Sequence, residues 1–515
     1  MIIHFKDTLM NERLSRNLAS IMLACIATLE LAFSGIGYIP TYIYESEVGN
    51  RYFPDHLRVY LFLFLDLQCA ARHIPGESMV CVCNATYCDT VTRRAPKPDT
   101  FMSYTSSQNG SRFKTLSGPL LTCQETLELF PSTRYQTIEG FGGAATDAAG
   151  INWKNLSEPL QKLLVDAYFS KTGIEYNMLR VPIGGCDFST RPYAYNEQPV
   201  DDASLTNYSL SYEDYQYKVY PGMAASRAPV HLVATVWSPP PWMKTNGEFS
   251  GYSRLKPQYY QTYADYYYKF IEKYAAEGVP IWGITTTNEP TNGVIPLNFF
   301  NSLGWTGSWI VNHLGPLIRN STFSNVKIIT GDDQRATLMY WISRMIQDQP
   351  KVLDYIDGVG VHYYTDFITP AAVLTEVMKK IPQKFLLATE ACEGSFPWER
   401  QKVKLGSWQR AYNYISDIIT DLQHNAIGWI DWNLCLNAQG GPNWANNHVD
   451  SPIIVFPERG EFVKEPMFYA LGHFSKFVPR GSRVVRSVLR GLFPRVEQIA
   501  FLTPRGTLVI IFYNK

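Results

Sequence analysis

The sequence predicts an α/β fold, a (β/α)8 TIM barrel with an accessory β-sandwich, from three observations. Apolar strand-like segments alternate with amphipathic stretches from about residue 136 to residue 480. Residues 75–135 have little helical periodicity and many turn residues, as antiparallel strands do. The final segment, "TLVIIFYNK", is strand-like again, and we expect it to join those strands in the sandwich.

The barrel prediction depends on a count of eight strand candidates. The first, "FGGAATDA", lies near residue 141. The other seven are the apolar segments at 176–183, 230–237, 281–287, 326–331, 356–362, 384–389 and 426–433. Amphipathic stretches such as those at 257–277 and 407–423 separate the strands, as the outer helices of a barrel would. Strand and helix alternating eight times over about 340 residues favour a TIM barrel.

We expect four segments along the chain. They are a signal, an anchor or a mispredicted leader at 1–68, the first sandwich strands at 69–135, the barrel at 136–480, and a second set of sandwich strands at 481–515. The first segment contains two apolar runs, Leu18 to Ile39 with Glu30 inside it, and "VYLFLFL" at 59–65 after Arg58. A secretory signal needs about 7 to 15 apolar residues after a basic residue, whereas a membrane span needs about 20. One of the two runs is therefore predicted to be a signal or anchor.

Cysteines and glycosylation triplets favour an oxidising, secretory route. Four of the nine cysteines cluster, and we predict that Cys69 pairs with Cys81 and Cys83 with Cys88. N-x-Ser/Thr triplets, the acceptors for N-glycosylation, begin at Asn84, Asn109, Asn155, Asn207 and Asn320. Buried free thiols are expected on apolar strand-like segments, at Cys186, Cys392 and Cys435.

Composition and motifs exclude several classes of function. With 46 acidic residues against 46 Lys plus Arg, the net charge is zero and no global field favours nucleic acid. No H-E-x-x-H, Walker lysine loop or G-x-S-x-G motif occurs. "GFGGAA" at 140–145 imitates a dinucleotide fingerprint but follows no convincing apolar strand, so we interpret it as a tight barrel turn. We expect no cofactor and no metal.

Two glutamates lie where barrel strands are predicted to end. Glu289, in "GITTTNEPTN", follows the β-branched run of the fourth strand, and Pro290 cannot donate to a strand ladder. Glu390, in "KFLLATEAC", ends the seventh strand in the same way. Because the carboxyl ends of all barrel strands open on one face, both acids are expected at the same mouth. A solvated loop acid is the bland alternative for Glu289 taken alone.

Two such carboxyls suit glycosidic cleavage, because one can protonate the leaving oxygen and the other can stabilise or attack the anomeric carbon. Retaining enzymes hold them about 5 to 5.5 Å apart, and a wider gap admits a water and inverts the product. At an effective dielectric of about 20, two charges at that distance repel by roughly 3 kcal/mol, which would raise the pKa of the weaker acid by about two units.

Six motifs resemble one known family. They are "TTTNEP", "LLATEACEGS", "GVHYYTDF", "GWIDWNLCLNAQGGPNWANNHVDSPIIV", "VCVCNATYCD" and "KEPMFYALGHFSKFVP", and the match extends from about Cys69 to the end of the chain. They resemble the lysosomal glucosylceramidases of glycoside hydrolase family 30. The resemblance implies retaining hydrolysis of glucosylceramide to glucose and ceramide in the lysosome. It also implies a membrane-borne glycolipid substrate, a saposin-type activator, and peripheral association with anionic lipid.

The resemblance also implies roles for individual residues. Glu390 would be the nucleophile and Glu289 the acid/base, while Glu393 competes only weakly as nucleophile. Arg180 would hold the nucleophile ionised, with His362 beside it. The substrate-binding residues would be Asp187, Phe188, Trp237, Asn288, Tyr364, Trp432 and Asn447.

Two alternatives to this activity stand beside it. One is a catalytically inactive barrel that binds a carbohydrate or a partner, because the chain ends at "FYNK" where the family continues through further sandwich strands. Missing strands would leave an open sheet edge. The other is a related glycosidase of different sugar specificity, such as xylan or β-1,6-glucan.

Overall fold

The computed structural model describes residues 2–6, 66–119, 126–218, 230–293, 307–490 and 496–514. Eight parallel strands close into a barrel in the order β10-β11-β12-β13-β14-β7-β8-β9. They are β7 (Gly140–Ala144), β8 (Met178–Ile183), β9 (His231–Val236), β10 (Ile281–Thr285), β11 (Lys327–Gln334), β12 (Gly358–His362), β13 (Phe385–Glu390) and β14 (Ala426–Asn433). The predicted TIM barrel is therefore confirmed, and each strand falls on a segment that the sequence predicted.

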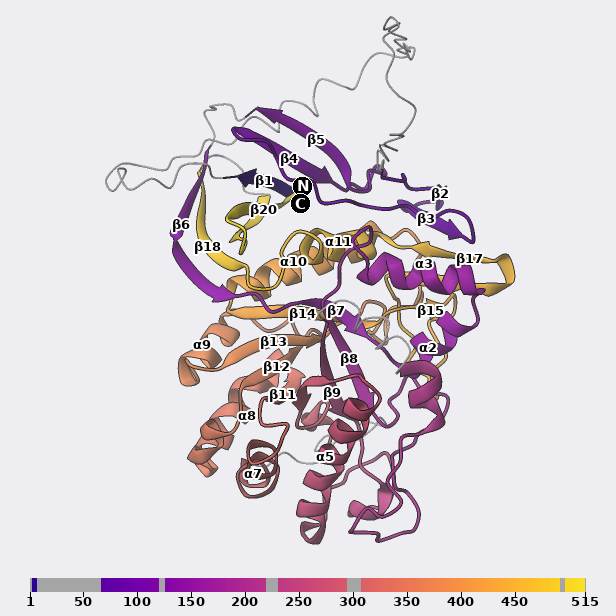
Figure 1. Cartoon of the computed structure of the whole chain (residues 1–515), viewed down its shortest axis with the longest axis vertical. Coiled ribbons are helices and arrows are strands. Elements are labelled where there is room, and N and C mark those ends of the chain that lie inside the picture. Colours follow the sequence, from indigo (N-terminus) through magenta and orange to yellow (C-terminus); the bar gives the residue numbers. More distant parts are fainter. Residues whose placement is uncertain are drawn as a thin grey trace, which may run out of the picture.

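Helices surround this barrel in the lower part of Figure 1. They are α2 (Asp147–Lys154), α3 (Glu158–Phe169), α5 (Tyr260–Ala276), α6 (Gly307–Trp309), α7 (Gly315–Arg319), α8 (Arg335–Asp348), α9 (Ala372–Lys380), α10 (Trp408–Gln423) and α11 (Pro466–Ser475). Short 3₁₀ or π turns are η1 (Asp214–Lys218), η2 (Pro241–Met243), η3 (Pro257–Tyr259), η4 (Pro290–Gly293), η5 (Ile310–Leu314), η6 (Pro350–Asp354) and η7 (Pro457–Arg459).

The inside of the barrel is a packed core. Met178, Val233, Ile329, Leu387 and Ile430 form one buried cluster, and each comes from a different strand. Strands that are buried on both faces need apolar side chains pointing inward as well as outward. This explains why the barrel strands read as nearly continuous apolar runs and not as alternating ones.

A seven-stranded sheet lies above the barrel in Figure 1, in the order β5-β4-β1-β20-β19-β18-β6. Its strands are β1 (Ile2–Lys6), β4 (Thr100–Thr105), β5 (Lys114–Pro119), β6 (Thr126–Thr137), β18 (Arg483–Arg490), β19 (Val496–Leu502) and β20 (Thr507–Asn514). The sheet contacts the barrel through α10, where Gln423 donates to the Gln498 carbonyl at 2.9 Å and the Tyr412 and Tyr513 ring centroids lie 5.0 Å apart. N- and C-terminal strands thus combine, as the sequence predicted.

One feature of the accessory strands differs from the prediction. The last strand, β20, pairs with β19 on one side and with β1 on the other, and the edge strands of this sheet are β5 and β6. Strand β1 itself was not expected, since the whole of 1–68 was assigned to a signal, anchor or leader. The two apolar runs that suggested a signal, at 18–39 and 59–65, lie outside the described residues and that assignment stays a prediction.

A separate five-stranded sheet has the order β15-β16-β17-β3-β2. It consists of β2 (Ala71–His73), β3 (Met79–Asn84), β15 (Leu436–Asn437), β16 (Ile453–Phe456) and β17 (Glu461–Lys464). The sequence predicted that residues 69–84 belong to the same sandwich as the C-terminal strands. Instead β3 pairs with β17, because the long segment after β14 leaves the barrel and offers its own antiparallel strands.

The cysteines pair as the sequence predicted. Disulfides join Cys69 to Cys81 and Cys83 to Cys88, the pairing that the sequence predicted. Cys186, Cys392 and Cys435 are buried free thiols, also as predicted. The glycosylation candidates are all exposed on the surface: Asn84, Asn109, Asn155, Asn207 and Asn320. In the part of the chain that the structure describes, the helices are too short or too polar to cross a bilayer.

Candidate active site

Glu289 is held at the barrel mouth by its own backbone. Strand β10 ends at Thr285, and the next residues continue beside the neighbouring strands, with the Asn288 amide donating to the Val236 carbonyl at 2.9 Å. The Glu289 amide donates to the Asp332 carbonyl at 2.9 Å. Glu289 has a φ of +42°, in the left-handed region that non-glycine residues rarely adopt. Such local strain clusters at functional sites.

Glu390 ends β13 and is almost completely buried. Its Oε2 contacts the guanidinium of Arg180, and its Oε1 accepts a hydrogen bond from the Tyr364 hydroxyl at 2.8 Å. Burial raises the pKa of the Glu390 carboxyl, whereas the positive charges of His362 and Arg180 oppose that rise. The carboxylate therefore has fixed partners on both oxygens and a fixed orientation.

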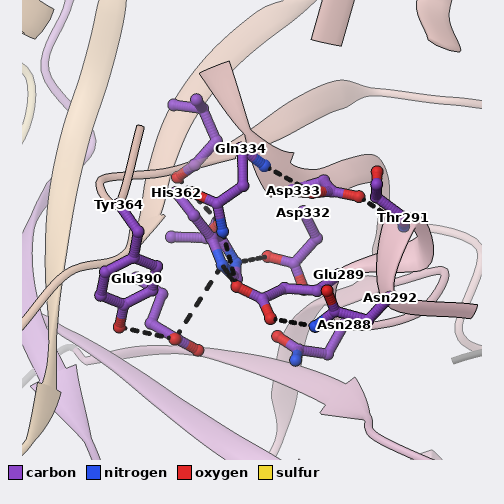
Figure 2. A network of polar contacts seen from close by, with 12 residues as sticks. Asn288, Glu289, Thr291, Asn292, Asp332, Asp333, Gln334, His362, Tyr364 and Glu390 are labelled. Carbon is purple, nitrogen blue, oxygen red and sulfur yellow. Dashed lines mark hydrogen bonds and ion pairs between the residues drawn. The ribbon is translucent and has the colours of Figure 1, made fainter. Parts of the chain in front are cut away.

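His362 lies between the two glutamates (Figure 2). Its Nδ1 is 3.0 Å from Glu289 Oε1 and 3.9 Å from Glu390 Oε1, and its Nε2 is 3.1 Å from Asp332 Oδ1. One oxygen of each glutamate and this ring nitrogen all lie within 4.8 Å of one another. Burial alone would lower the pKa of His362, but Glu390, Asp332 and Glu289 raise it to about 10. The ring is therefore a cation between carboxyls.

Arg180, on β8, is the second buried cation of the site. One terminal nitrogen contacts Glu390, and the other donates to Asn288 Oδ1 and Asp332 Oδ2, both at 2.8 Å. Asp332 also accepts from Thr285 Oγ1 at 2.7 Å. Burial would raise the pKa of Asp332, but Arg180 and His362 hold it well below its usual range. Asp332 is thus an ionised carboxylate that ties both cations in place.

Aromatic side chains form one wall beside these charges. The Trp237 and Trp432 rings stack with centroids 5.2 Å apart, and the edge of Phe188 meets Trp432 at 6.1 Å. The Arg180 guanidinium lies 4.8 Å from the Trp237 centroid and 5.4 Å from that of Trp432. Trp237, Trp432 and Phe188 belong to one buried cluster with Cys186 and Cys392. Aromatic faces of this kind also suit the C–H faces of a sugar.

Asp187 and Asn447 form a polar pair in the same region. Asn447 Nδ2 donates to Asp187 Oδ2 at 3.0 Å. Burial and the nearby charge of Glu390 raise the pKa of Asp187 to about 7. In mild acid this carboxyl is therefore largely protonated, and its hydroxyl can donate to a sugar hydroxyl while its other oxygen accepts.

The rival glutamate has different neighbours. Glu393 Oε1 accepts from the Tyr363 hydroxyl at 2.7 Å and from Asn413 Nδ2, on α10, at 3.1 Å. Burial raises its pKa to about 7. Glu393 is thus held by Tyr363 and by the outer helix α10, whereas Glu289 and Glu390 share His362.

The Glu289, His362 and Glu390 group is compact enough to raise the question of a metal. A histidine that binds a metal must be neutral, with a free lone pair on one ring nitrogen. His362, with a pKa raised to about 10, carries a proton on each ring nitrogen and faces a carboxylate on each side. This donor set fits a hydrogen-bonded charge network better than an ion.

Four supporting residues were not predicted from the sequence. Gln334 Nε2 donates to Glu289 Oε1, and Asn292 Nδ2 donates to Glu289 Oε2, both at 2.7 Å. Asp332 is described above. Asp333 accepts from the Thr291 amide at 2.7 Å and so fixes the turn that follows Glu289. Glu289 was predicted because it is an acid just after a barrel strand. The same reasoning applies to "GDDQ" at the end of β11 and could have predicted Asp332 and Asp333.

The structure thus gathers every predicted catalytic, substrate-binding and supporting residue at one end of the barrel. A closed parallel barrel with two glutamates after its fourth and seventh strands, beside aromatic walls, has the architecture of a glycoside hydrolase. The chain belongs to glycoside hydrolase family 30, because residues 138–478 match the family described as the glycosyl hydrolase family 30 TIM-barrel domain.

Known proteins place the chain more closely within this family. It is 42% identical over 470 residues to the lysosomal acid glucosylceramidase of Mus musculus, which covers 87% of this chain and 89% of the mouse protein. It is 40% identical over 444 residues to putative glucosylceramidase 3 of Caenorhabditis elegans, covering 82% and 84%. Among solved structures, SrfJ from Salmonella typhimurium is similar with a TM-score of 0.72 and 26% identity, covering 80% of this chain and 92% of SrfJ.

We expect the protein to be more stable in mild acid than at neutral pH, because burial raises the pKa of four carboxyls. Burial raises the pKa of Asp333 to about 6, of Asp187 and Glu393 to about 7, and of Asp431 to about 8, from ordinary values of 3.8 for Asp and 4.5 for Glu. Between about pH 4 and 8 the folded state therefore binds more protons than the unfolded state, and the free energy of unfolding falls as pH rises.

Scanning calorimetry should therefore give a higher Tm at pH 5 than at pH 8. Glu393→Gln should make this decline shallower, because one of the protons responsible is removed. A Tm that rises from pH 5 to pH 8 would contradict the assignment of these buried carboxyls.

Proposed function

We propose that the protein is a retaining β-glucosidase that hydrolyses glucosylceramide to glucose and ceramide. The observation that carries the proposal is the approach of Glu289 and Glu390 to within 4.8 Å through one oxygen each. Retaining enzymes hold the two carboxyls about 5 to 5.5 Å apart, whereas inverting enzymes separate them by about 6.5 to 9.5 Å. The similarity to the mouse and nematode proteins supports the choice of glucosylceramide.

In the first step, Glu390 attacks the anomeric carbon and the bond to the ceramide oxygen breaks. The electrons of that bond stay on the ceramide oxygen, which takes the proton of Glu289, so ceramide leaves as a neutral alcohol. Tyr364 and Arg180 fix the two oxygens of Glu390 for this attack. The product is a glucosyl ester of Glu390.

In the second step, Glu289 has lost its proton and acts as a base. It takes a proton from water while the water oxygen attacks the anomeric carbon and displaces the Glu390 carboxylate. Two displacements at one carbon retain its configuration. Gln334 and Asn292 hold the two oxygens of Glu289 through both steps.

The sugar would lie against the aromatic wall of Trp237, Trp432 and Phe188, with its outer hydroxyls at Asp187. Asn288, whose side-chain oxygen already accepts from Arg180, would use its amide nitrogen toward the 2-hydroxyl. Asn447 would orient Asp187 at the rim.

The proposed activity also has a cellular compartment and molecular partners. We propose a lysosomal glycoprotein that enters by a signal, works on a membrane-borne glycolipid, and is assisted by a saposin-type activator and anionic lipid. Disulfides, exposed asparagines in glycosylation triplets, and buried carboxyls that favour mild acid support an acidic compartment on the secretory route.

Changing each of the two catalytic glutamates to glutamine should give a different pattern of activity loss on two substrates. Glu390→Gln should abolish hydrolysis of both glucosylceramide and a fluorogenic β-glucoside, because the nucleophile is gone. Glu289→Gln should lose about 10²- to 10⁴-fold on glucosylceramide, and much less on an activated glucoside whose leaving group needs no proton. Purified protein assayed on both substrates, with Glu393→Gln as the matched control, checks this.

An unaltered protein that hydrolyses neither substrate would instead favour the inactive, binding-only barrel. Equal losses of Glu289→Gln on both substrates would remove Glu289 as the acid. Activity on xylan or β-1,6-glucan in place of the glucoside would assign the other sugar specificity.

Asp187 is expected to recognise the sugar and not to take part in bond breaking. Asp187→Ala should lower kcat/KM for the fluorogenic glucoside by about 10- to 200-fold, the value of hydrogen bonds from a group of this kind. Asn447→Ala should cost less, since Asn447 acts through Asp187. An Asp187→Ala protein with unchanged kcat/KM would contradict the sugar position proposed above.

A further inference from the structure

Asn292 follows Glu289 by three residues and contacts its side chain (Figure 2), where Asn292 Nδ2 donates to Glu289 Oε2 at 2.7 Å. We infer that Asn292 is a positioning residue for the acid step: it fixes the proton that Oε2 carries and stabilises the charge left on Oε2 when that proton departs. This role rests on the proposed function, in which Glu289 is the acid/base. It further requires that Asn292 helps the first step of the reaction and opposes the second.

The other oxygen of Glu289 already faces two donors. Gln334 Nε2 donates to Oε1 at 2.7 Å, and the charged His362 ring directs Nδ1 at the same oxygen from 3.0 Å. A carboxyl oxygen has two lone pairs, so a proton on Oε1 would have to face one of these N–H groups. The catalytic proton is therefore carried by Oε2.

The Asn292 amide also restricts where that proton points. Oε2 has two acceptor positions, and Asn292 Nδ2 takes one of them. The proton has to use the other position. A general acid needs its proton within hydrogen-bond reach of the leaving oxygen, and a direction that is fixed before substrate binds supplies part of this geometry in advance.

The turn after Glu289 holds Asn292 in place. The backbone amide of Asn292 donates to the Glu289 carbonyl at 2.9 Å, where η4 begins. In a 3₁₀ turn the side chains of residues i and i+3 lie one above the other, so position 292 is the one that faces Glu289. Thr291 ties the turn to the barrel, because its backbone amide donates to Asp333 at 2.7 Å and its hydroxyl accepts from Trp341 Nε1 at 2.9 Å.

The hydrogen bond from Asn292 changes strength during the reaction. In the first step Oε2 gives its proton to the ceramide oxygen, and negative charge develops on Oε2. Hydrogen bonds to a charged acceptor are roughly twice as strong as those to a neutral one, so the Asn292 amide stabilises this transition state more than the starting state. In the second step Oε2 takes a proton from water and the bond weakens again. The same amide thus helps ceramide to leave and opposes the release of glucose.

The two steps can be measured separately on Asn292→Ala. The value of kcat/KM for glucosylceramide in detergent reports the first step, which needs the proton, and it should fall about 3- to 10-fold. The value of kcat for a dinitrophenyl β-glucoside, whose leaving group needs no proton, reports the second step. It should be unchanged or rise by up to about threefold, because the base is no longer weakened. That result would also show that the variant is folded.

A series of aryl β-glucosides gives a second readout. With the amide removed, less of the proton is transferred in the first transition state and more charge stays on the leaving phenol. The dependence of kcat/KM on the acidity of that phenol should therefore be steeper in Asn292→Ala than in the unaltered protein. Asn292→Asp should steepen it further, because a carboxylate beside Oε2 repels the charge that develops there.

Thr291→Val is the matched control, because Thr291 belongs to the same turn and its hydroxyl contacts Trp341 on α8. This variant should change both steps by the same factor and leave the dependence on the leaving group as it is in the unaltered protein. A dependence as steep as that of Asn292→Ala would assign the effect to the turn as a whole and overturn the role of the Asn292 amide.

Two further outcomes would overturn the inference. Equal losses in both steps of Asn292→Ala would make Asn292 a structural residue of the turn, and kinetics identical to those of the unaltered protein would remove it from the reaction. Failure of the proposed function is a different result, because an unaltered protein that hydrolyses neither glucosylceramide nor the aryl glucosides would show it before any variant is compared.

Discussion

The buried ion network of Arg180 and His362 with Asp332, Glu289 and Glu390 is the interaction on which the rest of the site depends. Two cations face three carboxyls, so the network is electrically neutral when one carboxyl carries a proton. Removing one partner from such a buried network typically costs about 3 to 5 kcal/mol, because a charge is left uncompensated. The network thus fixes the position of both glutamates beside the pocket.

The barrel creates this network by bringing distant strands to one end. Arg180 comes from β8, Asp332 from β11, His362 from β12 and Glu390 from β13. An irregularity in β11 matters here: the register shifts between Gly331 and Asp333, and Asp332 has a φ of +55°. The bulge turns the Asp332 side chain toward both cations, and it exposes the Asp332 carbonyl to the Glu289 amide.

Much of this architecture could be predicted from the sequence because it follows from periodicity. Apolar runs separated by amphipathic stretches gave eight strands, and strand ends then put Glu289 and Glu390 at one mouth. The central position of His362 and the role of Asp332 could not be derived this way. Both depend on the bulge in β11 and on how side chains from neighbouring strands meet, and neither leaves a periodic signal. Strand β1 was missed because residues 1–68 were interpreted through their apolar runs alone.

Covalent displacement by Glu390 is the central step of the proposed reaction, and trapping the intermediate tests it most directly. A 2-deoxy-2-fluoro-β-glucoside with a good leaving group should glycosylate the enzyme and stay bound, since the fluorine slows the second step. Peptide mass spectrometry should then find one fluoroglucosyl group on Glu390. A label on Glu289 or Glu393, or glucose released with inverted configuration and no labelled peptide, would contradict the account.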